Sequence, residues 1–326
     1  MTKRITVLAT GGTIAGSGAR GTGRGYTPGR IGVETLAAEA RALGIAAELD
    51  TEDIAAIGSQ NIDWALWERL HAHIAAALAR DAAGVIVTHG TDTAEETAFL
   101  LDLTLAAGKP VVVVGAMRPA DAVGSDGMRN FANAVRVAGD PAACGRGVLV
   151  VMGDEVFAAS DVRKAATTSV DAFRGFPRGP IAAVTPSSLD WFGPPARAGE
   201  GARFAWPAAL PQVDILAAYA GMGDCTVEAL LGCGARGLVL EGMGQGNAPD
   251  AVIAALARAA RGGVPVVRSS RVDQGYVDRN LEVDDDALGF VAARSHGPAK
   301  ARILLQLLIA SGITDPAAMQ AHFDRR

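Results

Sequence analysis

The chain has 326 residues, more than one hydrophobic core usually supports, so two domains are expected. Apolar residues make up 49% of it, but they occur in short runs between charged residues, which argues against a membrane-spanning helix. The net charge is −5 and the positive residues are scattered. This pattern disfavours nucleic acid as a partner and is compatible with a small polar substrate.

The first two-thirds of the chain alternate short β-branched runs with helical patterns. This alternation is typical of a mostly parallel sheet covered by helices. Apolar residues at helical spacing predict helices over residues 63–80 and 94–106, each covering a face of the sheet. The clear strand candidates are residues 5–10, 85–88, 111–115 and 147–152.

Residues 187–212 interrupt this pattern with prolines and glycines, a composition that supports neither helix nor strand. We take residues 189–212 as a linker between a larger N-terminal α/β domain, residues 1–188, and a smaller C-terminal α/β domain, residues 213–326. The alternation resumes there, with strands at 213–219, 237–241 and 264–268 and helices from about Thr226, Pro249, Pro298 and Asp315.

The N-terminus and the cysteines favour a cytoplasmic protein. The apolar run at residues 5–9 is too short for a signal-peptide core, and no cleavage site follows it. The three cysteines form neither a C-x-x-C pair nor a pattern with nearby histidines, so neither a metal site nor a disulfide framework is expected. The acidic run at residues 284–286 is better explained as a loop or a helix start than as a metal site. We therefore predict no metal and no cofactor.

Two strand ends carry similar turns. In a parallel sheet, ligands bind beyond the carboxyl ends of the strands, and these turns lie at residues 10–13 (TGGT) and 88–93 (THGTDT). Each places threonine hydroxyls beside glycines that expose backbone N–H groups. A hydroxyl nucleophile needs such donors to stabilise an oxyanion. Either motif taken alone is also what a tight turn after a strand looks like.

Residues 16–21 fit the dinucleotide pattern G-x-G-x-x-G, but the chain continues with glycines and a proline that cannot open a helix. This composition indicates a mobile loop instead, with Tyr26 near its end as a functional side chain or as a loop anchor. Lys164 taken alone is typical of a solvated surface lysine. Placed against Thr91 in a desolvated site, it could act as a base, while the neighbouring Asp92 holds the geometry or binds a substrate ammonium.

The histidines give weaker signals. His71 and His73 lie two residues apart on a predicted helix and face different directions, which excludes a shared metal on that helix. His89 follows a strand and is better explained as structural than as catalytic. No G-x-S-x-G elbow is present, so a serine–histidine–aspartate hydrolase is disfavoured.

Residues 9–16 (ATGGTIAG) and 87–97 (VTHGTDTAEET) resemble the two signature motifs of bacterial-type L-asparaginases, the asparaginase/glutaminase family. The likeness extends over nearly the whole chain. Further similar blocks are residues 57–60, 114–119, 146–152, 267–272, 282–285 and 300–306.

The resemblance implies a role for each matching residue. Thr13 corresponds to the primary nucleophile and Tyr26 to the group that helps to activate it. Thr91, Asp92 and Lys164 correspond to a second triad, in which the lysine supports the threonine hydroxyl and the aspartate binds the substrate amino group. The implied substrate-binding residues are Ser59, Gln60, Thr91, Asp92, Ala116, Asn247 and Glu282.

The family assembles as dimers of dimers, so the resemblance implies a homotetramer. Asn247 and Glu282 match residues that complete the site of a neighbouring subunit, and a monomer should be nearly inactive. Exported members often carry a disulfide, but this chain has Arg80 or Asp81 and Ala107 in the corresponding region. The lack of cysteine there again favours a cytoplasmic form.

The implied reaction is hydrolysis of L-asparagine to L-aspartate and ammonia. Thr13 attacks the amide carbon, ammonia leaves, and water hydrolyses the acyl-enzyme; direct attack by water is the alternative. The order in which Thr13 and Thr91 act stays open, as does the base, which is either Tyr26 or Lys164 through Thr91.

Two departures from the family pattern, Asn61 and residues 273–277, leave the preference for asparagine or glutamine open. A broader glutaminase-asparaginase is therefore one alternative. The other is a non-catalytic amino-acid sensor of the same fold.

Overall fold

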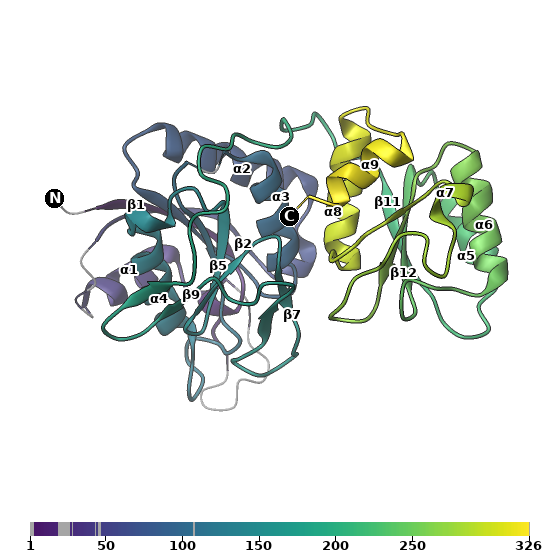
Figure 1. Cartoon of the computed structure of the whole chain (residues 1–326). Helices are drawn as coiled ribbons and strands as arrows, with labels where there is room; N and C mark the ends of the chain where they lie inside the picture. Colours follow the sequence, from purple (N-terminus) through teal and green to yellow (C-terminus); the bar gives the residue numbers. More distant parts are fainter. Residues whose placement is uncertain are drawn as a thin grey trace. The chain divides into compact units, whose positions relative to one another are not determined.

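The computed structural model describes residues 3–18, 27, 29–42, 44, 47–106 and 108–325. The chain divides into two compact units, Met1–Arg203 and Phe204–Arg326. Each unit is an α/β structure built on its own sheet (Figure 1), which confirms the predicted two-domain α/β fold.

The first unit contains an eight-stranded sheet in the order β10-β9-β6-β5-β4-β3-β1-β2. The strands β2, β1, β3, β4 and β5 are parallel to one another, and the remaining three pair antiparallel. A separate hairpin pairs β7 (Val162–Lys164) with β8 (Phe173–Gly175). The strands of the sheet are β1 (Arg4–Gly11), β2 (Glu48–Ile57), β3 (Gly84–Thr88), β4 (Val111–Val114), β5 (Val148–Met152), β6 (Glu155–Ala158), β9 (Ala182–Val184) and β10 (Leu189–Trp191).

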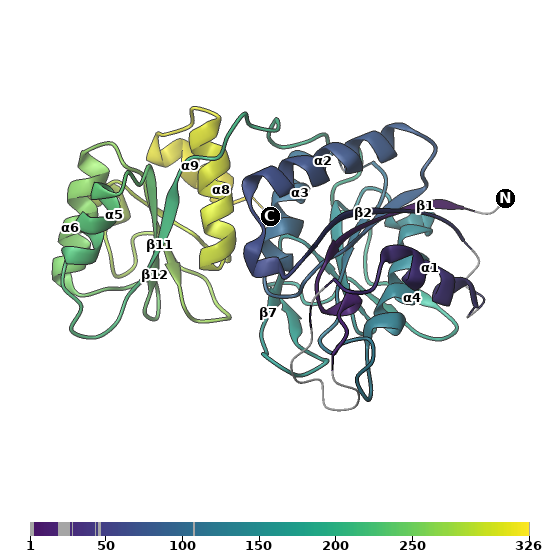
Figure 2. The same cartoon turned by 180° about the vertical axis from the view of Figure 1, so that it is seen from behind.

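Helices cover both faces of this sheet. The helices α1 (Val33–Ala42) and α4 (Gly127–Ala138) pack on one face, and α2 (Trp64–Ala79) and α3 (Ala94–Thr104) pack on the other (Figures 1 and 2). Side chains alternate between the faces along the central strands, as the pleat requires: Ile86 enters the α1/α4 core, whereas its neighbours on β3 enter the α2/α3 core. The predicted helices at 63–80 and 94–106 correspond to α2 and α3.

The strand order places a topological switch point between β1 and β3. From β1 the chain moves outward to β2, and from β3 it moves the other way to β4 and β5. The connections therefore diverge from the carboxyl ends of β1 and β3, which leaves room for a ligand at that edge. Both threonine–glycine turns follow these two strands.

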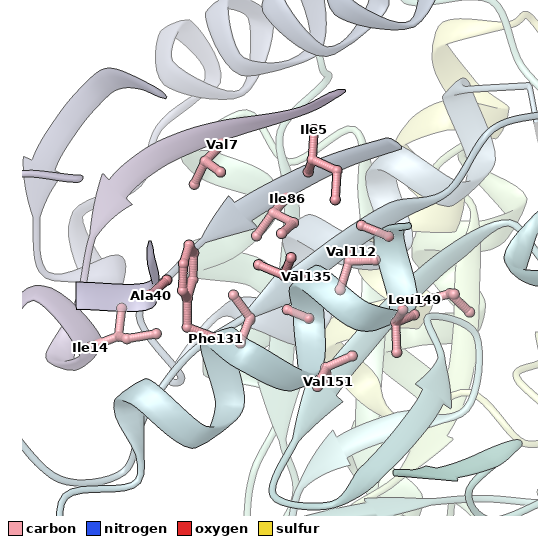
Figure 3. Close-up of a cluster of buried hydrophobic side chains, with 14 of the residues drawn as sticks. Ile5, Val7, Ile14, Ala40, Ile86, Val112, Phe131, Val135, Leu149 and Val151 are labelled. Atoms are coloured by element: carbon pink, nitrogen blue, oxygen red, sulfur yellow. The ribbon is translucent and has the colours of Figure 1, made fainter. Parts of the chain in front are cut away.

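The connection β4–α4–β5 has the opposite hand to β3–α3–β4, because the two step in the same direction along the sheet but their helices lie on opposite faces. Right-handed connections are the strong norm in parallel sheets. The β4–α4–β5 connection packs the start of α4 against the residues that follow β1 and β4. A Cβ built on Gly127 would lie 3.3 Å from Cγ1 of Ile14 and 3.6 Å from Cβ of Ala116. Figure 3 shows Ile14 in this core near Ala40 and Phe131.

The second unit has a four-stranded parallel sheet in the order β11-β12-β13-β14. The helices α5 and α6 lie on one side of it and α8 on the other (Figures 1 and 2). Its elements are β11 (Val213–Ala217), α5 (Cys225–Gly232), β12 (Gly237–Gly242), α6 (Asp250–Arg261), β13 (Val266–Ser270), α7 (Asp285–Leu288), β14 (Phe290–Ala292), α8 (Pro298–Ala310) and α9 (Pro316–Phe323).

Two expectations about local structure have different outcomes. The acidic run starts α7, where the Asp284 side chain accepts a hydrogen bond from Ala287 N, so the predicted helix start is confirmed. The expectation that residues 187–212 hold no strand is wrong at β10, which pairs antiparallel with β9. Pairing with a neighbouring strand decides the structure there, against a local composition rich in proline and glycine.

Candidate active site

The turns after β1 and β3 are in direct backbone contact. Gly12, which precedes Thr13, has φ of 80°. A Cβ built on it would lie 2.5 Å from Gly90 N and 2.6 Å from Gly90 Cα, so only glycine fits between the turns. The hydroxyl of Thr10 also donates to the carbonyl of Thr88 at 2.9 Å, which ties the two strand ends together. Thr13 and Thr91 are both buried, on neighbouring turns.

Lys164, at the end of β7, bonds to two polar residues of the second turn. Its Nζ donates to Oγ1 of Thr91 at 2.9 Å and to Oδ1 of Asp92 at 2.6 Å. The Lys164 side chain is 19% exposed and that of Asp92 is 63% exposed, so solvent screens the ion pair and geometry matters more than its energy. The backbone N–H of Lys164 donates to Glu95 at 2.8 Å, which holds β7 against the start of α3.

Of the residues expected to bind substrate in the first unit, Ser59 contacts the Thr91 turn directly. A Cβ on Gly90 would lie 2.6 Å from Oγ of Ser59, and Oγ1 of Thr93 donates to the carbonyl of Ser59 at 2.9 Å. Gln60 is exposed on the short helix η2 (Ser59–Asn61). Ala116 is fully buried.

His89 is the centre of a buried hydrogen-bond chain. The indole N–H of Trp67 can only donate, and its partner is Oγ1 of Thr97 at 2.8 Å. Thr97 in turn lies 2.9 Å from Nε2 of His89, whose Nδ1 lies 2.7 Å from the carbonyl of Gly90. Since a carbonyl only accepts, Nδ1 carries the proton and Nε2 accepts from Thr97. Burial lowers the pKa of the His89 imidazole and keeps it neutral.

The direction of this chain gives His89 a supporting role. It connects α2 and α3 to the carbonyl of Gly90 and so orients the peptide that leads into Thr91. The ring is fully buried and uses both nitrogens within the protein. This agrees with the interpretation of His89 as structural.

Asp126 and Asn130 hold the end of β4 and were not identified from the sequence. The carboxylate of Asp126 accepts from the N–H groups of Met117 and Arg118, at 3.0 and 2.9 Å. The buried Asn130 donates from Nδ2 to the carbonyl of Gly115 at 3.0 Å. A Cβ on Gly115 would in turn lie 3.0 Å from Cγ2 of Thr91, so these bonds act next to the second turn. In the sequence, Asp126 and Asn130 could be noticed only as polar residues that face a predicted sheet.

Three further predicted residues are Tyr26, Asn247 and Glu282. Tyr26 lies outside the described residues. Asn247 and Glu282 belong to the second unit, where Nδ2 of Asn247 donates to Oε2 of Glu282. They come from two separate loops, one after β12 and one before α7.

Within the described ranges, no three histidine, cysteine or acidic side chains come together in a way that could hold a metal ion. Nor is any helix in that part of the chain long and apolar enough to cross a membrane. The three cysteines, Cys144, Cys225 and Cys233, are exposed free thiols.

Comparison with known proteins agrees with this arrangement of strands and turns. The family model "Asparaginase, N-terminal" matches residues 4–197, and "Glutaminase/Asparaginase C-terminal domain" matches residues 212–323. The chain belongs to the asparaginase family. The resemblance drawn from the two motifs is therefore confirmed, and with it the expected enzyme class.

Individual relatives match along almost the whole chain. "Probable L-asparaginase periplasmic" of Haemophilus influenzae is 42% identical over 323 residues, covering 98% of this chain and 92% of the relative. "L-asparaginase 2" of Escherichia coli is 42% identical over 324 residues, with the same coverage of 98% and 92%. "Glutaminase-asparaginase" of Pseudomonas fluorescens biotype A is 39% identical over 311 residues, covering 94% and 86%.

Proposed function

We propose that the protein hydrolyses L-asparagine to L-aspartate and ammonia, with Thr13 as the nucleophile. Membership of the asparaginase family and the names of the relatives support the reaction. The observation that carries the assignment of the site is the contact between the Thr13 and Thr91 turns, with Lys164 bonded to Thr91.

The chemistry of the substrate matches the groups at this strand edge. An asparagine zwitterion presents a carboxylate, an ammonium and a neutral amide. Ser59 and nearby backbone N–H groups suit the carboxylate, while Asp92 suits the ammonium because Lys164 uses only its Oδ1. Thr13 follows two glycines whose backbone can approach an oxyanion closely. Gln60 and the backbone of Ala116 are further substrate contacts in this proposal.

The reaction runs through an acyl-enzyme. The hydroxyl oxygen of Thr13 attacks the side-chain amide carbon, the C–N bond breaks, and the nitrogen leaves as ammonia after taking up a proton. Water then cleaves the ester and releases aspartate. Two groups can take up the hydroxyl proton of Thr13. One is Tyr26, and the other is Lys164 acting through Thr91, whose Oγ1 lies 2.9 Å from Nζ of Lys164.

The quaternary structure and the location complete the proposal. The active form is a homotetramer of two dimers, in which Asn247 and Glu282 act at the site of a neighbouring subunit. A dissociated monomer is then nearly inactive. The cytoplasmic location stays a prediction from the sequence, and one relative is named periplasmic.

A broader amide specificity is the second candidate, supported by the relative named glutaminase-asparaginase. One methylene in a pocket discriminates by only about 10- to 200-fold, so activity on both substrates is expected. Rates of ammonia release from asparagine and from glutamine at sub-saturating concentration separate the two readings. Binding of asparagine without ammonia release would instead indicate a sensor.

The nucleophile is tested with Thr13→Ala, which should abolish ammonia release while the protein still folds and assembles. Thr104→Ala is the matched control, because Thr104 is an equally buried threonine whose hydroxyl only donates to the carbonyl of Leu100 within α3. The control should keep its turnover. A Thr13→Ala protein that retains more than a few per cent of the wild-type rate would overturn the assignment.

A further inference from the structure

Arg268 on β13 is a buried cation with every donor in use. Its side chain is 1% exposed, and that of its partner Asp285 is fully buried. A guanidinium has five N–H groups. Each has an acceptor here: Oδ1 of Asp285 at 2.6 Å, Oδ2 of Asp285 at 2.7 Å, and the carbonyls of Gln245 at 2.8 Å, Asp278 at 3.2 Å and Gly246 at 3.4 Å.

These acceptors lie on two loops that are far apart in the sequence. The carbonyls of Gln245 and Gly246 belong to residues 243–247, which we call the Asn247 loop. Asp278 and Asp285 are the first and last residues of the segment 278–285, which we call the Glu282 loop. Arg268 lies between the two loops and bonds to both.

Further bonds within this group leave the loops little freedom. Oε1 of Gln245 accepts from the N–H of Asp278 at 2.9 Å, a second direct link between the loops. The carboxylate of Asp285 also accepts from the N–H of Asn280 at 3.0 Å, where the chain turns with φ of 57°. The loops finally meet at their functional ends, where Asn247 donates to Glu282.

We infer that Arg268, neutralised by Asp285, is a positioning residue for catalysis. It fixes the Asn247 loop against the Glu282 loop and so sets the geometry of the pair that is presented to the neighbouring subunit. This inference rests on the proposed function, because it assumes that Asn247 and Glu282 contact substrate. Arg268 itself is buried and touches no substrate.

The effect should fall on substrate binding more than on the chemical step. The carboxylate of Glu282 suits the substrate ammonium, as that of Asp92 does, and this interaction is made in both the ground state and the transition state. Loss of such uniform binding raises KM and leaves kcat nearly unchanged. A general loss of stability would lower the amount of active enzyme and leave KM unchanged.

The variant must remove both charges, because deleting one partner of a buried pair leaves an uncompensated charge and is strongly destabilising, whereas apolar replacement of both is often tolerated. We therefore choose Arg268→Met/Asp285→Leu. The matched control is Arg197→Met/Asp102→Leu in the first unit. That pair is similarly buried, its carboxylate also accepts a backbone N–H, from Val148 at 2.8 Å, and its guanidinium also bonds a carbonyl.

KM for asparagine should rise about tenfold in Arg268→Met/Asp285→Leu with kcat within about threefold of wild type, while the control keeps its KM. Glu282→Gln sharpens the test. It should raise KM in the wild-type background but add little in the pair variant, because residues that act as a unit are not additive.

Several outcomes would overturn the inference. The first is a pair variant with the KM of the control, and the second is an equal fold-effect of Glu282→Gln in both backgrounds. If Glu282→Gln leaves KM unchanged in wild type, Glu282 has no role and the inference falls with it, while Thr13→Ala still tests the reaction. If the pair variant does not fold, Arg268→Lys decides: it keeps a positive charge opposite Asp285 but loses the planar fork that bonds both loops, and an unchanged KM contradicts the inference.

Discussion

The Thr13 and Thr91 turns of the first unit and the Asn247 and Glu282 loops of the second unit are held in place in different ways. The turns follow adjacent parallel strands, and their backbones touch at Gly12 and Gly90. Of the two loops, only the Asn247 loop directly follows a strand, β12. A buried guanidinium and its carboxylate connect the loops, together with the bonds from Asp278 N to Gln245 and from Asn247 to Glu282.

The difference shows what each half of the proposed site can tolerate. A site formed by touching backbones depends on the absence of side chains, so an added methyl group should damage it more than the loss of any one hydrogen bond. A site held by a buried charge depends on one side chain and should survive changes in the surrounding loop residues.

Gly12→Ala should have the largest effect. The added Cβ would lie 2.5 Å from Gly90 N, and both neighbours are backbone that cannot move aside without shifting the Thr13 or Thr91 turn. A shift of about 1 Å at a catalytic group can lower turnover about 100-fold. We also expect a loss of about 3 kcal/mol in the free energy of unfolding. Ammonia release and denaturant unfolding measure the two effects.

Gly179→Ala separates the close contact from the backbone strain. Gly179 has φ of 73°, near the 80° of Gly12, but nothing lies within 4 Å of its added Cβ. Alanine in this left-handed conformation should cost about 1 kcal/mol and leave turnover unchanged. Equal losses in the two variants would mean that the turns do not depend on their contact.

Lys164→Met tests whether the Thr91 turn needs the lysine as well as the backbone. The thioether keeps the length of the side chain but can neither donate to Thr91 and Asp92 nor carry a proton. Turnover should fall by about 100-fold, the lower end of the range for a lost acid–base group, because the two turns keep their backbone contact.

Lys109→Met is the control for this change. Lys109 is also a bonded lysine of the first unit, and it donates to the carbonyls of Leu78 and Arg80 at 2.8 and 2.9 Å. It should keep full turnover. Wild-type activity in Lys164→Met would show that the lysine bonds to Thr91 for structural reasons alone.

Much of the fold could be predicted because its central strands are buried apolar runs. The strands β1, β3, β4 and β5 are short, β-branched and enclosed on both faces, which a local pattern reveals. The strand β2 lies at the sheet edge and half of its ten residues are exposed, so its pattern is weak. Only pairing with β9 makes β10 a strand.

Some features of the candidate site could also be predicted from the sequence, and others could not. Contact between the Thr13 and Thr91 turns could be anticipated because both follow strands of one parallel sheet. The approach of Lys164 from a separate hairpin has no local signal, and only the resemblance to a family pointed to it. Asp126, Asn130 and Arg268 act through bonds to distant backbone atoms, and a linear pattern does not record such partners.

The smallest expected effect concerns pH and the chain from Trp67 through Thr97 to His89. Burial lowers the pKa of His89 in the folded protein, whereas an unfolded histidine takes up a proton near pH 6.5. Below that pH the unfolded state therefore binds more protons. The free energy of unfolding should fall as the pH drops from 7 to 5, by up to about 1.4 kcal/mol per pH unit for this residue.

Denaturant unfolding measured from pH 7 to pH 5 should show that the free energy of unfolding falls less steeply in His89→Gln than in wild type. His71→Gln should change the fall less, since burial also lowers the pKa of His71 but that side chain is only partly buried. An unchanged fall in His89→Gln would mean that folded His89 is protonated at low pH. Nε2 could then not accept from Thr97, and the direction of the hydrogen bond between Thr97 and His89 would reverse.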